Sequence, residues 1–563
     1  MLDRTKEPGA QGEPLYGDVA VSVLRSGRPI RVIGGRYGLS SKDFSPAMAR
    51  AVFDELKKPE PMREFTVGIT DDVTHLSLEV DTAFRIKAKG LTETIFYGFG
   101  SDGTVGAAKQ IASIVGSQDG MYAQAFFSYS AKKSGGYTLS QLRFCTEPVA
   151  AAWQIESADF VFCNKAAYVG RFDMLSKLRP GGVFVLNAPW TVGEMATRLP
   201  ADMRRSLVDK KVRFYTIDAT AIAASEQLGA RINTIMEAVY FHLSGVLPEE
   251  VWRPAMQAIV RKTYMHEGGE TVARNLDAID KAVGAIRQIA VPQEWGAAEA
   301  QVAPAQDVPA LVSEVAEPCD RLEGDSLPVS LFSPDGSIPM GTTAYEKRKI
   351  AIDIPQWNPA KCVQCTICST VCSHAAIRPY LLDKDEAAKK PADIATAATK
   401  DPKLAGLEFR IQVYPADCTG CGSCATMCPG HALTMVPLYP EIESEEPRWK
   451  WVTENVSEKP DILPRFTVRG AQFHRPLMEF SGACGGCGET PYVKLLTQLF
   501  GERLLIANAT GCSSIWGANY PSNAYCTLSD GRGPAWGNSL FEDNAEYGYG
   551  MAVALEHRRI RAR

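Results

Sequence analysis

Long apolar runs are absent from this 563-residue sequence. No stretch approaches the ~20 consecutive apolar residues that a membrane-spanning helix needs, and residues 1–8 hold no apolar core of the kind found in a secretory signal peptide. An excess of basic charge is absent too, because 60 Lys and Arg stand against 65 Asp and Glu, a net charge of −5. That balance argues against a nucleic-acid-binding face. We therefore expect a cytoplasmic protein that binds neither membrane nor nucleic acid.

A disulfide framework is excluded as well. The chain has 15 cysteines, an odd number, and it is far longer than the small domains that disulfides stabilise. Eleven of the cysteines fall in three tight groups between Cys362 and Cys512, a clustering typical of metal binding. The isolated cysteines are expected to be small buried hydrophobes or incidental thiols; they are Cys145, Cys163, Cys319 and Cys526.

The length predicts about three or four domains. Residues 1–90 read as an α/β unit, with strands at Pro29–Ile33 and Phe65–Ile69 around a helix at Ser45–Leu56. A second α/β region covers 91–290, where a strand at Glu93–Gly98 enters a Gly-rich turn and a helix follows at Val105–Ile114. Residues 291–345 are rich in proline and read as a linker. A cysteine-rich module follows at 346–440, and residues 441–563 read as α/β again.

Two complete cysteine motifs have the spacing C-x2-C-x2-C-x3-C, which is that of ferredoxin-type 4Fe–4S clusters. In two-cluster modules the fourth cysteine of each motif binds the other cluster. One cluster should therefore use Cys362, Cys365, Cys368 and Cys428, and the other should use Cys418, Cys421, Cys424 and Cys372. Zinc knuckles are the alternative, but they need paired C-x2-C units rather than a run of three.

A third group holds Cys484, Cys487 and Cys512, one thiol short of a 4Fe–4S cluster. Cys526 is one candidate for the fourth ligand. The other reading is that the fourth ligand lies outside this chain.

The segments around the third group are similar to the pyruvate:ferredoxin (flavodoxin) oxidoreductases. They are 481–492 (SGACGGCGETPY), 509–517 (ATGCSSIWG), 533–536 (GPAW) and 538–546 (NSLFEDNAE). Upstream, residues 2–9 (LDRTKEPG) and 132–136 (KKSGG) resemble the same family, so the resemblance spans nearly the whole chain. It implies a multidomain α/β fold with parallel-sheet domains and a two-cluster ferredoxin-like α+β module.

The resemblance also implies an activity. The family decarboxylates pyruvate oxidatively with coenzyme A to acetyl-CoA and CO₂, and passes two electrons through three 4Fe–4S clusters to ferredoxin or flavodoxin. It uses thiamine diphosphate (TPP) and Mg²⁺, and its full-length members are homodimers. By resemblance, Cys484, Cys487 and Cys512 would hold the cluster nearest TPP, with Glu489 and Cys512 beside TPP itself. The plain alternative for Glu489 is a surface carboxylate.

A coenzyme A site is implied in the second region. By resemblance it would use a backbone-lined anion loop that opens a helix, a lysine and two polar side chains: Gly100, Ser101, Asp102, Gly103, Thr104, Lys132, Asn233 and Asn275. An ordinary strand–helix turn and a solvated lysine are the alternatives. Ala108 and Gln141 depart from the Asn and His expected beside these motifs.

Parts of the family pattern have no counterpart here. Residues 1–90 would be the end of a transketolase C-terminal-like domain, 91–290 a CoA-binding-like (gamma) domain, and 441–563 an incomplete TPP domain. The TPP pyrimidine domain and the Mg²⁺ segment are not found, and Ser529–Arg532 reads as a turn. We therefore expect a fragment without pyruvate turnover of its own. A stand-alone iron–sulfur electron carrier and an inactive remnant are the alternatives.

Overall fold

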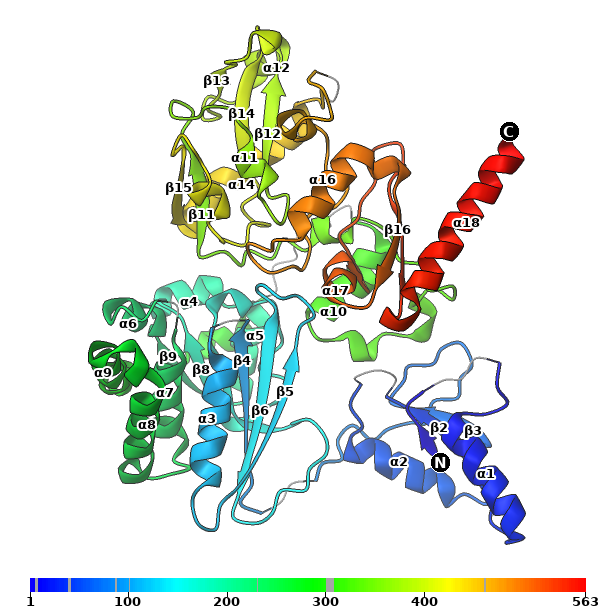
Figure 1. Ribbon diagram of the computed structural model, residues 1–563. Coiled ribbons are helices and arrows are strands. Elements are labelled where there is room, and N and C mark those ends of the chain that lie inside the picture. The colour runs from blue at the N-terminus through cyan, green and yellow to red at the C-terminus, as the bar shows by residue number, and fades with distance from the viewer. Residues whose placement is uncertain are drawn as a thin grey trace. The chain divides into compact units, whose positions relative to one another are not determined.

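The computed structural model describes residues 1–5, 9–38, 42–86, 89–100, 102–229, 231–299, 308–459 and 462–563. The chain divides into two compact units (Figure 1). Unit 1 contains Met1–Tyr129 and Tyr137–Gly336, and unit 2 contains Ser130–Gly136 and Ser337–Arg563. The loop Ser130–Gly136 thus belongs by its contacts to unit 2, although both of its flanks belong to unit 1.

Unit 1 begins with a small parallel sheet of strand order β1–β2–β3. Its strands are β1 (Leu2–Asp3), β2 (Gly34–Tyr37) and β3 (Glu64–Val67), and its helices are α1 (Pro14–Ser26) and α2 (Pro46–Leu56). The strand expected at Pro29–Ile33 was wrong, because pairing with β3 starts at Gly34. Gly34 and Gly35 are the first two residues of β2. A Cβ on Gly35 would lie 2.5 Å from the ring of Phe65, so glycine here permits close packing within the sheet.

A seven-stranded sheet in the order β10–β9–β8–β7–β4–β6–β5 forms the centre of unit 1. Four neighbouring strands are parallel, namely β4 (Thr92–Phe99), β7 (Ala158–Cys163), β8 (Leu178–Asn187) and β9 (Arg213–Ile217). Antiparallel strands flank them, namely β5 (Tyr122–Tyr129), β6 (Tyr137–Cys145) and β10 (Arg287–Ile289). The expected parallel α/β core is confirmed, and the sheet as a whole is mixed.

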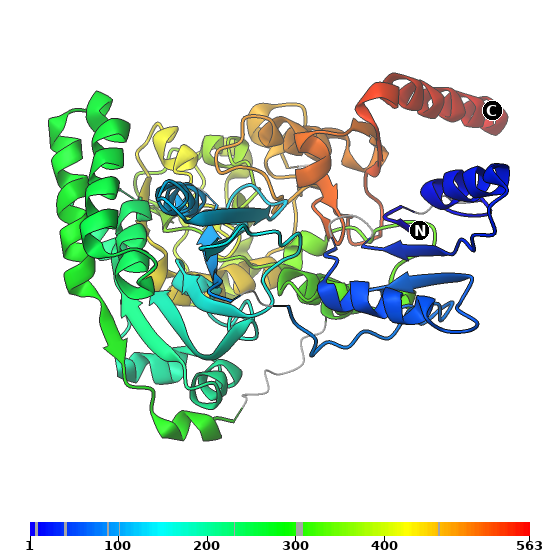
Figure 2. The same ribbon diagram turned by 90° about the horizontal axis from the view of Figure 1, so that it is seen from below.

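Helices cover both faces of this sheet. One core contains α3 (Thr104–Gly116), α7 (Asn233–Ser244), α8 (Glu249–Tyr264) and α9 (Gly269–Ala285), of which α7 to α9 pack together (Figure 2). The opposite core contains α4 (Val192–Arg198) and α5 (Ala201–Asp209). Helix α6 (Ala219–Ser225) packs with α7 and α9.

The stretch expected as a linker is packed rather than extended. Its described residues form short helical turns, including η3 (Gln293–Ala297), η4 (Val312–Ala316) and α10 (Glu317–Asp320). Trp295, Val312 and Val315 are buried. Proline does not prevent these turns, because Pro292 directly precedes η3 and Pro318 lies in the first turn of α10, where its missing N–H is not needed.

Unit 2 opens with the cysteine module, which repeats itself. Strand β11 (Asp353–Trp357) precedes the first motif and pairs with β15 (Leu433–Pro437), which follows the second. Strand β12 (Ile377–Leu382) follows the first motif and pairs with β14 (Glu408–Val413), which precedes the second. Each of the two strand pairs therefore contains one strand from each half of the module. The short strand β13 (Ala397–Ala398) adds to β14.

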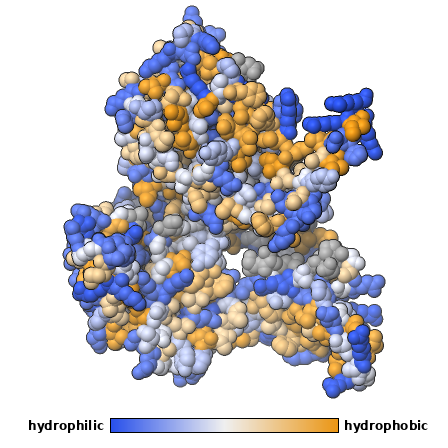
Figure 3. Space-filling view, in the orientation of Figure 1, coloured by the Kyte–Doolittle hydropathy of each residue, from blue (hydrophilic) through white to orange (hydrophobic). Residues whose placement is uncertain are grey.

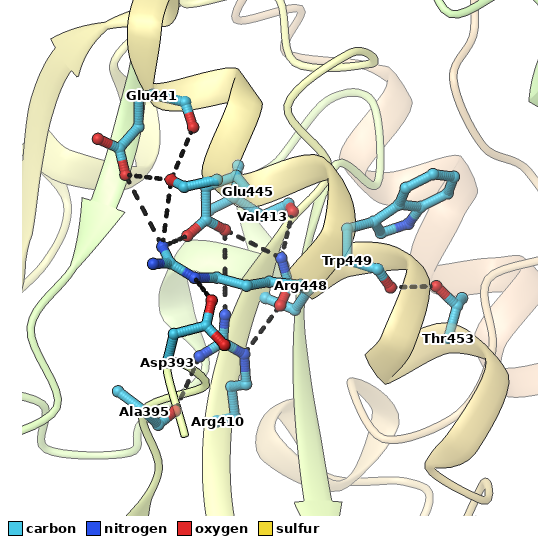
Figure 4. Close-up of polar contacts among 11 residues, drawn as sticks. Asp393, Ala395, Arg410, Val413, Glu441, Glu445, Arg448, Trp449 and Thr453 are labelled. Atoms are coloured by element: carbon cyan, nitrogen blue, oxygen red, sulfur yellow. Dashed lines mark hydrogen bonds and ion pairs between the residues drawn. The ribbon is translucent and has the colours of Figure 1, made fainter. Parts of the chain in front are cut away.

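Charged and polar side chains connect helix α14 (Leu438–Asn455) to β14 (Figure 4). Glu445 accepts from Arg448 at 2.7 Å and from Gln412 at 3.1 Å, and it lies 3.9 Å from the guanidinium of Arg410. Arg410 is buried and donates to the Ala395 carbonyl at 2.8 Å. The cluster satisfies a guanidinium that would otherwise be costly to bury.

The rest of unit 2 is α/β. It contains α15 (Val468–Ala471), α16 (Thr490–Phe500), α17 (Cys512–Gly517) and α18 (Asn544–Ala562), with β16 (Leu505–Ala509) parallel to β19 (Ala535–Ser539). Helix α18 buries none of its residues. On the face shown in Figure 3, hydrophobic residues gather over α16. Leu496 of α16 is exposed, and so is Phe466, whose ring packs against Phe500 at the end of α16. No described helix has the length and apolar character needed to cross a bilayer.

Candidate metal centres

The two cysteine loops have the same backbone path. Gln364 and Thr366 in the first loop have φ of 60° and 62°, and the equivalent Gly420 and Gly422 in the second have φ of 70° and 74°. In each loop a left-handed residue stands on either side of the middle cysteine, Cys365 or Cys421, and turns the chain there. Non-glycine residues adopt this conformation at a cost, and such strain is typical of functional loops.

Backbone N–H groups donate to cysteine sulfurs at matching positions. Gln364 donates to Cys362 Sγ and Gly420 donates to Cys418 Sγ, both at 3.4 Å. The fourth cysteines repeat the pattern: Ala376 donates to Cys372 Sγ at 3.3 Å, and Ala432 donates to Cys428 Sγ at 3.2 Å. Such bonds stabilise negative charge on sulfur and tune the potential of an iron–sulfur cluster.

The fourth cysteine of each motif reaches toward the other motif. The thiols of Cys418 and Cys424 both interact electrostatically with Cys372. Cys428 packs in the same core as Cys362 and Cys368, and two residues beyond it Gly430 closely approaches the Lys361 carbonyl. The structure therefore places the fourth cysteine of each motif near thiols of the opposite motif.

Short helices carry the third cysteine of each motif. Cys368 lies in α11 (Ile367–Thr370) and Cys424 in α13 (Ser423–Thr426), and both are buried. Burial, followed by the neighbouring thiols Cys372 and Cys421, raises the pKa of Cys424 to about 12. These groups would bind as thiolates only with positive charge supplied by metal. The clustered soft donors and the N–H groups aimed at them fit 4Fe–4S cubes.

A site for a single metal ion is a different matter. In the part of the chain that the structure describes, no group of three or more Cys, His, Asp or Glu side chains could hold one ion. A 4Fe–4S cluster has a different requirement, because each of its thiolates binds a different iron.

The third cysteine group touches the second motif. A Cβ on Gly485 would lie 3.4 Å from Cys421 Cβ, and one on Gly486 would lie 3.8 Å from the same atom. Cys487 packs against the small core that includes Trp516 of α17, the helix that begins at Cys512. Cys484 and Cys512 are exposed. The loop that carries Cys484 and Cys487 therefore lies directly on the loop of Cys421.

The candidate fourth ligand, Cys526, has other neighbours. It is buried, and its Sγ donates to the Pro476 carbonyl at 3.5 Å. Glu489, expected beside TPP, stands at the N-terminus of α16 and acts electrostatically on Tyr525.

Lys132, expected to contact coenzyme A, lies in unit 2. Its Nζ is 2.9 Å from Glu346 Oε2, and the adjoining Lys133 N–H donates to the Gly482 carbonyl at 2.8 Å. The Gly485 N–H donates to Ser134 Oγ at 2.5 Å. The loop Ser130–Gly136 thus supports the cysteine loop of Cys484.

The remaining CoA candidates lie in unit 1, except that Ser101 falls outside the described residues. Asp102 accepts from the N–H groups of Phe99 and Thr104, both at 2.8 Å, so its carboxylate shapes the turn from within, and burial raises its pKa. Gly103 has φ 89° at the start of α3, and a Cβ there would lie 3.0 Å from Asn233. The structure thus places Gly103 beside Asn233.

Asn275 has a structural role of its own. It is buried in α9 and bonds Thr234 at 3.3 Å. Its side-chain N–H donates to the Thr271 carbonyl at 2.9 Å. The bond with Thr234 joins α9 to α7, and the bond with Thr271 lies within α9.

The position of one charged residue near the cysteine motifs was not predicted from the sequence. Lys494 is 2% exposed and donates to backbone carbonyls at the end of α11. In sequence it is a lone lysine on an amphipathic helix, for which a solvated position is the usual outcome, and nothing in the cysteine spacing points to it.

Comparison with known proteins gives consistent matches. A family profile described as "Pyruvate ferredoxin/flavodoxin oxidoreductase" matches residues 93–285, and a "4Fe-4S dicluster domain" profile matches 359–432. A "Domain of unknown function" profile matches 297–351, across much of the stretch expected as a linker.

Individual proteins match over nearly the whole chain. The pyruvate:ferredoxin oxidoreductase of Moorella thermoacetica is 50% identical over 99% of this chain and 48% of its own length. The pyruvate-flavodoxin oxidoreductase of Enterobacter agglomerans is 45% identical over 99% of this chain and 48% of its own. Among solved structures, pyruvate oxidoreductase subunit PORC of Thermotoga maritima is 20% identical over 36% of this chain and 99% of that one, with a TM-score of 0.29. The chain spans about half the length of these curated relatives, and it belongs to the pyruvate:ferredoxin/flavodoxin oxidoreductase family of iron–sulfur oxidoreductases.

Proposed function

We propose that this chain supplies the CoA-binding part and the electron-transfer part of a pyruvate:ferredoxin/flavodoxin oxidoreductase. The reaction is the oxidative decarboxylation of pyruvate with coenzyme A to acetyl-CoA and CO₂. Its two electrons leave one at a time through 4Fe–4S clusters to ferredoxin or flavodoxin. The observation that carries the proposal is the pair of matched cysteine loops, with equivalent left-handed positions and equivalent N–H···S bonds.

We assign eight of the thiols to two clusters. Cys362, Cys365, Cys368 and Cys428 would hold the first, and Cys418, Cys421, Cys424 and Cys372 the second. Cys484, Cys487 and Cys512 would contribute to a third. Because the Cys484 loop lies against Cys421, electrons would pass from the third cluster to the second and then to the first.

The remaining cofactors belong to the complete protein. TPP with Mg²⁺, when bound, would supply the electron-sink chemistry of decarboxylation, and Glu489 and Cys512 are the residues of this chain proposed to lie beside it. The turn at Gly100–Thr104 with Asn233 is proposed to bind the phosphates of coenzyme A, with Asn275 as a further contact in the same unit. Lys132, in unit 2, is proposed separately as a residue that contacts coenzyme A. We also propose that the complete protein is a homodimer. A cytoplasmic location is proposed because low-potential thiolate clusters suit a reducing compartment.

Direct electron transfer tests this function. The chain is prepared anaerobically, reduced, freed of reductant and mixed with oxidised ferredoxin or flavodoxin, and acceptor reduction is followed optically. We expect transfer to at least one acceptor. Cys365→Ser should slow it strongly, whereas Cys145→Ser, at an isolated buried cysteine, should not.

Two results would count against the proposal. A chain with intact, reducible clusters that reduces neither acceptor would defeat the electron-transfer role. Equal rates for Cys365→Ser and Cys145→Ser would remove the first cluster from the path.

A further inference from the structure

Lys494 places a buried positive charge at the end of α11, the helix that carries Cys368, and beside Cys372, which follows it. Its Nζ donates to the carbonyl of Ser369, to that of Thr370 at 3.3 Å and to that of Cys372 at 3.2 Å. An ammonium group has three N–H donors and no acceptor, and here it meets three carbonyl oxygens. The side chain therefore caps the carboxyl end of α11, where a cation is favoured.

This charge is not neutralised by an acid. Among the described residues, the groups that act electrostatically on Lys494 are Cys372, Arg378 and Cys368, with no carboxylate among them. The neighbouring Arg378, by contrast, is paired with Glu479. Burying an unpaired ammonium is costly, so the position calls for compensating negative charge from another source.

The lysine is also held rigidly. Helix α16 follows the loop of Cys484 and Cys487, and a chain of side-chain bonds ties its surroundings to α11. Ser369 Oγ donates to Gln472 at 2.9 Å, Gln472 donates to Gln498 at 3.2 Å, and Gln498 donates to the His474 carbonyl at 2.9 Å. The ammonium group is therefore buried and held in one position beside Cys372.

A 4Fe–4S cluster gains one negative charge when it is reduced. A fixed cation nearby stabilises the reduced form more than the oxidised form, and in a poorly screened interior the effect is large. We propose that Lys494 is a positioning residue that raises the reduction potential of the cysteine module, acting most strongly on the cluster that Cys372 completes. The inference rests on the proposed two-cluster assignment and adds to it the residue that sets the potential.

Redox titrations of the 563-residue chain test the inference. Midpoint potentials are read by EPR in the wild type, Lys494→Gln and Lys494→Arg, after iron and sulfide are counted. The matched control is Lys450→Gln, because Lys450 is 69% exposed on α14. Lys494→Gln should lower the reduction equilibrium constant of at least one cluster about tenfold, a shift of about 59 mV to more negative potential for a one-electron couple. Lys494→Arg and Lys450→Gln should stay close to the wild type.

Three other outcomes would overturn the inference. Unchanged potentials in Lys494→Gln would show that the charge has no influence. An equal shift in Lys494→Arg would assign the effect to packing, and loss of a cluster in all Lys494 variants, Lys494→Arg included, would assign it to assembly. A wild type that binds no iron would instead defeat the proposed function itself.

Discussion

Single residues in the two cysteine loops adopt one backbone conformation with different side chains. Gly420 and Gly422 supply positive φ in the second loop, where Gln364 and Thr366 do so in the first. The two glycines differ in their surroundings. A Cβ on Gly420 would lie 2.9 Å from the Asp353 carbonyl oxygen, whereas one on Gly422 would meet nothing within 4 Å.

The glycines therefore predict unequal costs for the same substitution. Gly422→Ala should lose about 1–2 kcal/mol from its left-handed backbone alone. Gly420→Ala should lose measurably more, because the methyl group would press on β11, and it should also bind less iron at the second cluster. Thermal unfolding and iron content of the two variants, side by side, measure the difference. Equal losses would mean that the contact with Asp353 is relieved without cost.

The residue scale also shows what spacing alone could predict. The C-x2-C-x2-C-x3-C pattern predicts clusters because the chain between ligands is short and leaves few geometries. It could not reveal that Gln364 and Thr366 take the left-handed conformation, since neither residue favours it. Nor could it find Lys494, whose partners are carbonyls of residues more than a hundred positions away.

Whole elements are positioned by contacts that local sequence does not encode. The strand expected at Pro29–Ile33 begins instead at Gly34 because its register is set by β3. The loop Ser130–Gly136 joins two strands of unit 1 but belongs to unit 2, because Lys133 and Ser134 bond the segment 482–485. The sequence correctly predicted β4 and α3, whose apolar side chains are buried on the faces of the central sheet.

Helix α14 gives an element-scale prediction. Glu445→Gln removes the carboxylate between Arg410 and Arg448 and leaves the buried Arg410 guanidinium without its acid. Breaking a buried pair in this way costs about 3 kcal/mol, so the melting temperature of unit 2 should fall. Glu454→Gln on the same helix is the matched control. Glu454 is 59% exposed and lies 4.0 Å from Lys450, so its loss should cost less than about 1 kcal/mol.

Differential scanning calorimetry of the two variants decides between them. Similar melting temperatures would show that water or Gln412 compensates Arg410, and that α14 is held by its apolar contacts, such as Val452, instead.

At the scale of the molecule, the chain joins two kinds of structure. Unit 1 holds an α/β sheet with the turn that Asp102 shapes before α3, and unit 2 holds three cysteine groups in succession. The cysteine groups were predicted from sequence, whereas the contact of the Cys484 loop with Cys421 could not be predicted from it. The CoA residues remain a proposal, since the structure gathers Gly103 and Asn233 while Lys132 belongs to the other unit.

The iron and labile sulfide content of the anaerobically prepared chain tests the central claim most directly. Two complete cysteine sets predict about eight irons and about eight sulfides per chain, rising to about twelve of each if the third group also fills. Zinc in nearly stoichiometric amount, without sulfide, would contradict the account, since matched thiolate loops would then serve a different metal and could carry no electron.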